Sequence, residues 1–214
     1  ARRGSFCHSA AKCLHFLGRT QKMRKPPKRR TKPQPKRQNP KQTNKNAVMT
    51  LYIYPKHKTH TRADTDRLIA QSFARFQPDS PQMPAIRRTA AGKPSFEGGF
   101  PQLGVTHSDS VVIIALADTP FGIDCEDRDR RVKHMDALCK RFFAAAEQDF
   151  VRNAGSEEEK TRRFLEIWVK KEAYVKYTGE GLKALSAVDT TTLSGRFENR
   201  SDEKHILYIY YPQP

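Results

Sequence analysis

The sequence lacks several features that mark common protein classes. It contains no long apolar run, so no membrane-spanning helix is predicted. Its four cysteines show neither Cys-x-x-Cys spacing nor a zinc-type pairing with histidine, which argues against a zinc site and indicates reduced thiols in a reducing, cytoplasmic compartment. These cysteines are Cys7, Cys13, Cys125 and Cys139. The first 48 residues contain no aspartate and no glutamate.

The missing acidic residues divide the chain into two parts. Of the 40 lysines and arginines, 15 fall in residues 1–48, which leaves 25 basic residues against all 23 acidic ones in residues 49–214. A basic segment punctuated by prolines cannot bury enough apolar surface to offset the entropy of ordering it, so residues 1–48 are predicted to be a disordered tail. A mitochondrial-type transit segment and a dispensable extension are two further interpretations of the same residues.

The formal net charge of +17 also fits a protein that binds nucleic acid or another polyanion. No aromatic interleaving and no recognition motif accompany the basic tail, so weak, salt-sensitive contact is the most that this composition predicts. A specific nucleic-acid partner is therefore not expected. Polyanion binding remains an alternative function for the chain.

Hydrophobic periodicity predicts alternating strands and helices after the tail. The predicted strands are residues 51–54, 103–106, 111–117, 121–126, 187–192 and 205–211. The predicted helices are residues 65–76, 132–151 and 157–177, the last with Ser156 as its N-cap. This order predicts an α+β fold of two related halves around a shared cleft.

Acidic residues alternate in the fourth predicted strand. Asp124 and Glu126 are two residues apart, so in an extended strand both carboxylates share a face. Farther along, Glu172 and Lys176 are four residues apart and lie on one stripe of a helix. Three carboxylates and an ammonium group facing one pocket suit Mg²⁺ and a bound diphosphate. Taken singly, each motif is more often a solvated charged surface.

Several motifs occur in one order between residues 92 and 182. They are Gly-Lys-Pro at 92–94, Val-Thr-His-Ser at 105–108, Gly-Ile-Asp-x-Glu at 122–126, Arg-Phe-Phe-x-x-x-Glu at 141–147, Trp-x-x-Lys-Glu-Ala-x-x-Lys at 168–176 and Gly-x-Gly-Leu at 179–182. In this order and spacing, the motifs resemble those of the 4′-phosphopantetheinyl transferase superfamily, specifically its longer, pseudo-dimeric type that activates surfactin synthetase and other peptide synthetases.

The resemblance implies a fold and an activity. Two α+β halves, residues 49–118 and residues 119–214, would form a pseudo-dimer with the active site in the cleft between them and the metal site on the second half. The enzyme would transfer the 4′-phosphopantetheine arm of coenzyme A to a serine of an apo acyl or peptidyl carrier protein, with Mg²⁺ as cofactor. The carrier could serve fatty-acid, polyketide or peptide synthesis. An inactive member of the family would keep the fold without the transfer.

The resemblance also implies roles for individual residues. The implied metal ligands are Asp124, Glu126 and Glu172. The implied catalytic residues are Glu172 as base, Lys176 and His107. The implied coenzyme A contacts are Lys93, His107, Lys176 and Arg62. Lys171 is given a secondary phosphate or carrier contact, and Trp168 a packing role.

The expected partner is an acidic carrier protein, bound by a monomeric enzyme that contacts neither membrane nor specific nucleic acid. Four basic residues follow the metal strand and could steer such a partner: Arg128, Arg130, Arg131 and Lys133. The other interpretation is an ordinary charged loop, compensated by Asp127 and Asp129.

Overall fold

The computed structural model describes residues 48–80 and 82–213, so the predicted tail lies almost wholly outside the described residues. The described part has a mixed α+β fold, as the sequence predicts. Its strands are β1 (Met49–Pro55), β2 (Ile86–Arg88), β3 (Pro94–Phe96), β4 (Gln102–His107), β5 (Val111–Ala117), β6 (Gly122–Asp127), β7 (Arg196–Asn199) and β8 (His205–Tyr211). Its helices are α2 (Arg62–Phe76), α3 (Met135–Phe142), α4 (Ala145–Arg152), α5 (Glu157–Thr178) and the 3₁₀ helix η1 (Leu182–Ala187).

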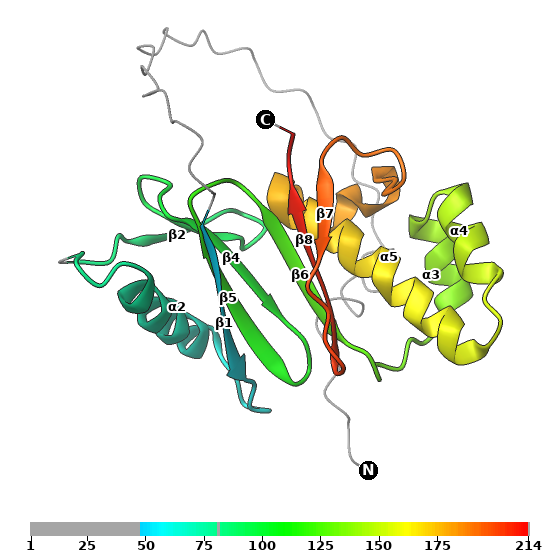
Figure 1. Ribbon diagram of the computed structural model, residues 1–214, viewed down its shortest axis with the longest axis horizontal. Coiled ribbons are helices and arrows are strands. Elements are labelled where there is room, and N and C mark those ends of the chain that lie inside the picture. Colours follow the sequence, from blue (N-terminus) through cyan, green and yellow to red (C-terminus); the bar gives the residue numbers. More distant parts are fainter. Residues whose placement is uncertain (1–47, 81, 214) are drawn as a thin grey trace, which may run out of the picture. The chain divides into compact units, whose positions relative to one another are not determined.

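The first sheet has the antiparallel strand order β1-β5-β4, and α2 packs against it (Figure 1). The helix begins at a capping box: the backbone N–H of Asp64 donates to Thr61 Oγ1 at 3.2 Å, and the Thr61 N–H donates to Asp64 Oδ2 at 2.9 Å. The helix therefore starts three residues before the predicted position. Ile69 and Phe73 of α2 enter a buried cluster with Ile114 of β5.

The second sheet has the antiparallel order β6-β8-β7, and α5 crosses it (Figure 1). Both sheets place the first strand at one edge, the last strand in the centre and the next-to-last strand at the other edge. A second core joins the sheets, because Ile113 and Ala115 of β5 pack in one cluster with Ile123 of β6 and Ile209 of β8. In consequence, β4 of the first sheet lies beside β6 of the second.

The predicted helix over residues 132–151 is wrong, because the chain breaks it after Phe142. Phe143 is extended, with φ −104° and ψ 139°. The Ala144 N–H then donates to Glu147 Oε2 at 2.7 Å, so the Glu147 carboxylate caps the start of α4. The buried Phe143 ring stacks on Phe164 of α5, with 5.1 Å between ring centroids. Tertiary packing therefore overrides a continuous helical pattern here.

The predicted strand over residues 187–192 is also wrong. The Val188 carbonyl accepts a hydrogen bond from Lys171 Nζ. The N–H and hydroxyl of Thr190 donate to Glu147 Oε1 at 2.8 Å and 2.7 Å. These polar groups bind a buried ion pair instead of a neighbouring strand, and the edge strand β7 starts only at Arg196.

Other predicted elements agree closely with the structure. The strands β5 and β8 have the predicted bounds. Ser156 caps α5 as predicted, accepting the Glu159 N–H at 3.1 Å. The short β2-β3 hairpin was not predicted. Among the helices of the described ranges, none is both long and apolar enough to cross a membrane.

Candidate active site

Two glycines set the close approach of the elements that carry the predicted site. A Cβ atom on Gly122, at the start of β6, would lie 1.9 Å from the carbonyl oxygen of Ala173 in α5. A Cβ atom on Gly104 of β4 would lie 2.5 Å from the Phe121 ring beside β6. At Gly122 the clash would be with backbone, so only glycine allows this spacing, whereas at Gly104 a larger residue would have to displace the Phe121 ring. The glycine of the Gly-Ile-Asp motif thus lets the carboxylate strand pack directly on the helix that carries Lys176.

The Asp124 carboxylate is buried where β4, β6 and α5 meet. Its Oδ1 lies 2.5 Å from Lys176 Nζ and accepts the Thr106 hydroxyl at 2.9 Å. Thr106 Oγ1 also accepts from Lys176 Nζ at 3.1 Å and from the Cys125 N–H at 3.1 Å. Desolvation opposes the charged form of Lys176, but the carboxylates of Asp124 and Glu172 raise its pKa above the ordinary value. This lysine is therefore a fixed positive charge at neutral pH.

Thr106 is a site residue that sequence reasoning missed. Its hydroxyl bridges Asp124 and Lys176, and the side chain is fully buried. The available signal was its position beside His107 in the Val-Thr-His-Ser motif. Threonine is common in strands because its branched side chain favours extended backbone, so its presence in β4 does not by itself indicate a polar role.

The second carboxylate of β6 has its own cationic partner. Glu126 is buried and forms an ion pair with Arg130, four residues later. Burial, together with the nearby Asp124 charge, raises the pKa of Glu126 above its ordinary value, although Arg130 acts in the opposite direction. Only 14% of the Arg130 side chain is exposed. The prediction that Arg130 belongs to an exposed basic docking segment is therefore wrong, because its largely buried guanidinium pairs with Glu126.

The donor set of β6 fits a hard cation. Asp124 and Glu126 are neighbouring buried carboxylates on one face of the strand, which are the hard oxygen donors that Mg²⁺ prefers. Glu172 is buried on α5, near enough to Lys176 to raise the pKa of that lysine. Over residues 48–80 and 82–213, however, no three His, Cys, Asp or Glu side chains converge into a group able to hold a metal ion. The third ligand stays a prediction.

The residues predicted to contact coenzyme A lie in three places. His107 ends β4 near Lys176; partial desolvation, with Lys176 and Lys56 as nearby cations, lowers its pKa to about 4, so it is neutral at pH 7. Lys93 donates from its Nζ to the Tyr177 carbonyl in the last turn of α5, at 2.8 Å. Arg62 is exposed in the first turn of α2. The structure thus groups His107 with the Asp124 and Lys176 pair.

Two neighbours of Glu172 in the helix motif are structural. Trp168 is 2% exposed and packs between Phe142 and Phe164, with ring centroids 5.9 Å and 5.8 Å away, as predicted. Lys171 is fully buried, and its Nζ lies 2.7 Å from Glu147 Oε2. The predicted phosphate or carrier contact of Lys171 is wrong, because the side chain points into the protein.

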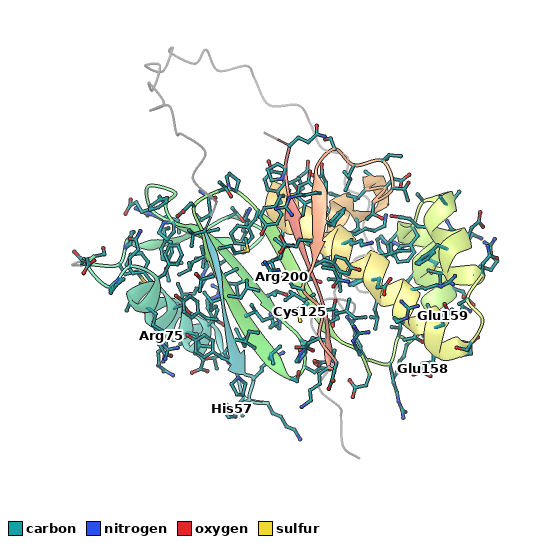
Figure 2. All side chains as sticks on the ribbon, viewed as in Figure 1. His57, Arg75, Cys125, Glu158, Glu159 and Arg200 are labelled. Atoms are coloured by element: carbon teal, nitrogen blue, oxygen red, sulfur yellow. The ribbon has the colours of Figure 1, made fainter. Side chains whose placement is uncertain are left out.

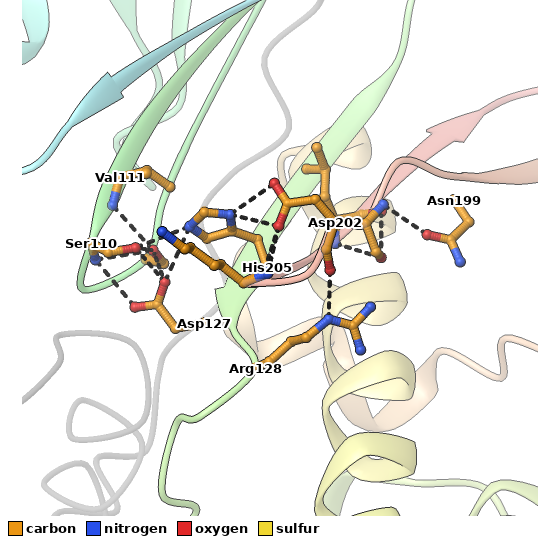
Figure 3. Close-up of polar contacts among 11 residues, drawn as sticks. Ser110, Val111, Asp127, Arg128, Asn199, Asp202 and His205 are labelled. Atoms are coloured by element: carbon orange, nitrogen blue, oxygen red, sulfur yellow. Dashed lines mark hydrogen bonds and ion pairs between the residues drawn. The ribbon is translucent and has the colours of Figure 1, made fainter.

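Asp127 anchors the end of β6 to the turn after β4, as Figure 3 shows. Its Oδ1 accepts the Ser108 and Ser110 hydroxyls at 2.6 Å and 2.5 Å. His205 Nε2 lies 3.1 Å from Ser110 Oγ, and its Nδ1 lies 3.0 Å from Asp202 Oδ1. The charged-loop interpretation has Asp127 compensate nearby basic residues, whereas in the structure its carboxylate accepts these hydroxyls and holds β6 to the turn after β4.

Cys125 lies between the two carboxylates along β6 and is labelled in Figure 2. It is buried, and burial followed by the neighbouring carboxylates raises the pKa of its thiol far above the ordinary value. Cys125 and Cys139 are both free. Neither thiol is suited to act as a nucleophile.

Comparison with known proteins identifies the region that carries β6 and α5. Residues 120–210 match the model of the 4′-phosphopantetheinyl transferase superfamily. The chain is 33% identical over 103 residues to 4′-phosphopantetheinyl transferase HetI of Nostoc sp., covering 46% of this chain and 43% of that protein. It is 33% identical over 109 residues to 4′-phosphopantetheinyl transferase psf-1 of Bacillus pumilus, covering 50% and 40%.

A third relative is 4′-phosphopantetheinyl transferase gsp of Aneurinibacillus migulanus, 29% identical over 98 residues that cover 45% of this chain and 39% of that protein. The aligned part of the chain thus spans about two fifths of the length of each of these relatives. The matched residues contain the buried carboxylates of β6 and the lysine of α5 that binds one of them. Over residues 120–210, the chain is therefore similar to the 4′-phosphopantetheinyl transferase superfamily.

Proposed function

We propose that the chain transfers the 4′-phosphopantetheine arm of coenzyme A to a serine hydroxyl of an apo carrier protein. The serine oxygen forms a bond to the phosphorus that bears the pantetheine arm, and the bond from that phosphorus to the bridging oxygen of the diphosphate breaks. Adenosine 3′,5′-bisphosphate leaves, and the serine proton passes to a base. The observation that carries this proposal is the pair of buried carboxylates, Asp124 and Glu126, with Lys176 bound to Asp124, within the region that matches the superfamily.

Asp124, Glu126 and Glu172 are the proposed ligands of Mg²⁺. The ion, when bound, would neutralise charge on the diphosphate and polarise the attacked phosphate. Lys176 carries a fixed positive charge at the same place and would stabilise negative charge that develops on the phosphate oxygens. Glu172 is the proposed base for the serine proton. Lys176, its neighbour on the helix stripe, interacts with this carboxylate electrostatically.

The coenzyme A contacts are assigned to His107, Lys93 and Arg62. Because its pKa is lowered to about 4, His107 would reach a phosphate oxygen as a neutral N–H donor. Lys93 is held beside the end of α5 by the Tyr177 carbonyl, from which its remaining N–H groups can reach a phosphate. Arg62 is exposed and available to the nucleotide end of the substrate.

The same strand order in both sheets supports two related halves, residues 49–118 and residues 119–214, with the site in a cleft between them. The contact of β4 with β6 supports a site built from both halves. Exposed Arg128 and Arg131 support the docking of an acidic carrier. The enzyme is proposed to act as a monomer in the cytoplasm.

The test is intact-mass analysis of a panel of apo carrier proteins incubated with the full chain, coenzyme A and Mg²⁺. We expect one carrier to gain one phosphopantetheine arm, with no gain when the metal is chelated. Lys176→Met should abolish the gain. The matched control is Lys170→Met on the same helix, because Lys170 lies over the Tyr208 ring and not at Asp124. No transfer to any carrier would overturn the proposal, and tight DNA binding at physiological salt would favour the polyanion alternative.

A further inference from the structure

Asp124 and Glu126, the two carboxylates on one face of β6, are each already paired with a basic side chain of the protein. Lys176 of α5 pairs with Asp124, and Arg130 pairs with Glu126. Lys176 acts on the phosphate in the proposed transfer, whereas Arg130 lies beside the site without a part in that reaction. Its burial beside a proposed metal ligand calls for one, because a guanidinium group there adds to the positive charge that a metal ion must overcome.

Arg130 is attached close to the metal strand. The Arg130 N–H donates to the Asp127 carbonyl at 3.1 Å, which closes a turn directly after β6. The backbone of Arg130 is therefore fixed, whereas its guanidinium is carried by a long side chain with several rotatable bonds. A change of partner for this side chain needs only a rotation of its own torsions, and the turn can stay in place.

A divalent cation and the guanidinium of Arg130 compete for Glu126. Mg²⁺ requires direct oxygen ligands, and Glu126 is one of only two adjacent carboxylates on this strand face. Two cations on one buried carboxylate repel each other strongly, because the surroundings screen charge less well than water does. Binding of the metal therefore loosens the ion pair between Arg130 and Glu126.

We propose that Arg130 is an exchanging counter-ion: it pairs with Glu126 while the metal is absent and turns to the phosphate oxygens of coenzyme A when the metal and the diphosphate are bound. This inference rests on the proposed function. A guanidinium group binds phosphate oxygens through two parallel N–H donors, so the diphosphate offers Arg130 a partner as good as the carboxylate that it leaves. The exchange keeps the site near neutrality in both states.

A fixed structural salt bridge and an exchanging counter-ion give opposite results when the arginine is removed. If the pair only orders the site, its loss disorders Glu126 and weakens both metal and coenzyme A binding. If Arg130 exchanges partners, its loss removes a competitor of the metal and a contact of the substrate. Metal affinity then rises while coenzyme A affinity falls.

The experiment measures Mg²⁺ binding to the full chain by calorimetry without coenzyme A, and then coenzyme A binding at saturating Mg²⁺, for the wild type and Arg130→Gln. We expect Mg²⁺ to bind about tenfold more tightly and coenzyme A about tenfold more weakly in the variant, each a typical size for a close charge contact. The matched control is Arg131→Gln. Arg131 is the next residue in the chain and its side chain is exposed, so this variant removes the same charge but should leave Mg²⁺ affinity unchanged.

Arg130→Lys keeps the positive charge but loses the planar guanidinium group. It should change the Mg²⁺ and coenzyme A affinities in the same directions as Arg130→Gln, but by smaller factors. It also serves as the second variant if thermal denaturation shows that Arg130→Gln is unfolded. Unchanged or weaker Mg²⁺ binding in the folded variants overturns the exchange, as does unchanged coenzyme A binding. A wild-type protein that binds no Mg²⁺ overturns it as well. Because neither measurement uses a carrier protein, a failure of transfer to every carrier is distinguishable from a failure of this inference.

Discussion

Replacing Lys171 with methionine removes one partner of the buried ion pair that joins α4, α5 and the segment after η1. Methionine keeps most of the side-chain volume, so the main loss is the charge. Glu147 is then left as a buried carboxylate without its ammonium partner. Breaking a buried pair on one side costs about 3–5 kcal/mol of folding free energy, because an uncompensated charge remains in the interior.

The contacts of Glu147 place the expected loss near the lower end of this range. Without Lys171, the carboxylate still accepts three hydrogen bonds, from the Ala144 N–H at 2.7 Å, the Thr190 N–H at 2.8 Å and the Thr190 hydroxyl at 2.7 Å. We therefore expect a loss of roughly 3 kcal/mol, which for a chain of this size lowers the melting temperature by roughly 10 °C.

The assay is urea unfolding followed by circular dichroism, with Lys170→Met as the matched control. Lys170 is the neighbouring lysine and rests on the Tyr208 ring near the surface, so its loss should cost less than about 1 kcal/mol. The double variant Lys171→Met with Glu147→Gln should lose less stability than the two single variants together, by about 1–3 kcal/mol. If Lys171→Met were as stable as Lys170→Met, Lys171 would not be paired in the interior.

Three further predictions concern the site and the tail. Asp124→Asn and Glu172→Gln should each lower single-turnover transfer roughly 100-fold or more at saturating Mg²⁺; turnover near that of the wild type in both would refute the site. Because the folded pKa of His107 is about 4, the unfolded chain takes up its proton first as pH falls below 6.5, so stability drops between pH 6.5 and 4. The free energy of unfolding, measured by urea titration, should fall less between pH 7 and pH 5 in His107→Asn than in the wild type. A chain that starts at Met49 should fold and transfer within a few-fold of the full chain at physiological salt; insolubility, or inactivity at every ionic strength, would show that the boundary is wrong.

Local periodicity was enough to predict the elements that carry the site. The apolar run of β5 and the alternation in β6 depend on neighbouring residues, so both strands were predicted to within one or two residues. The same is true of α5, whose start is fixed by Ser156 as N-cap. The long helix predicted over residues 132–151 failed because the break at Phe143 depends on a ring of α5 that is distant in sequence.

Polar partners of the site could not be predicted in the same way. Lys171 and Lys176 are five residues apart on one helix, and both are close in sequence to the carboxylate of Glu172. The sequence therefore does not show which carboxylate each lysine binds. Only the packing of α4 against α5 directs Lys171 to Glu147, while β6 provides Asp124 for Lys176. A charge pattern shows which faces are polar, but the partner of each charge depends on which element packs against that face.

The sequence by itself determined the α+β class, the shared face of Asp124 and Glu126, and the helix stripe of Glu172 and Lys176, because strand and helix geometry fix which neighbouring residues point together. The tertiary structure decided that Thr106 bridges this group and that Arg130 binds Glu126 instead of facing solvent. These contacts depend on how far each side chain is buried and which opposite charge lies within reach. Both are properties of the packed strands and helices, which no local pattern of residues contains.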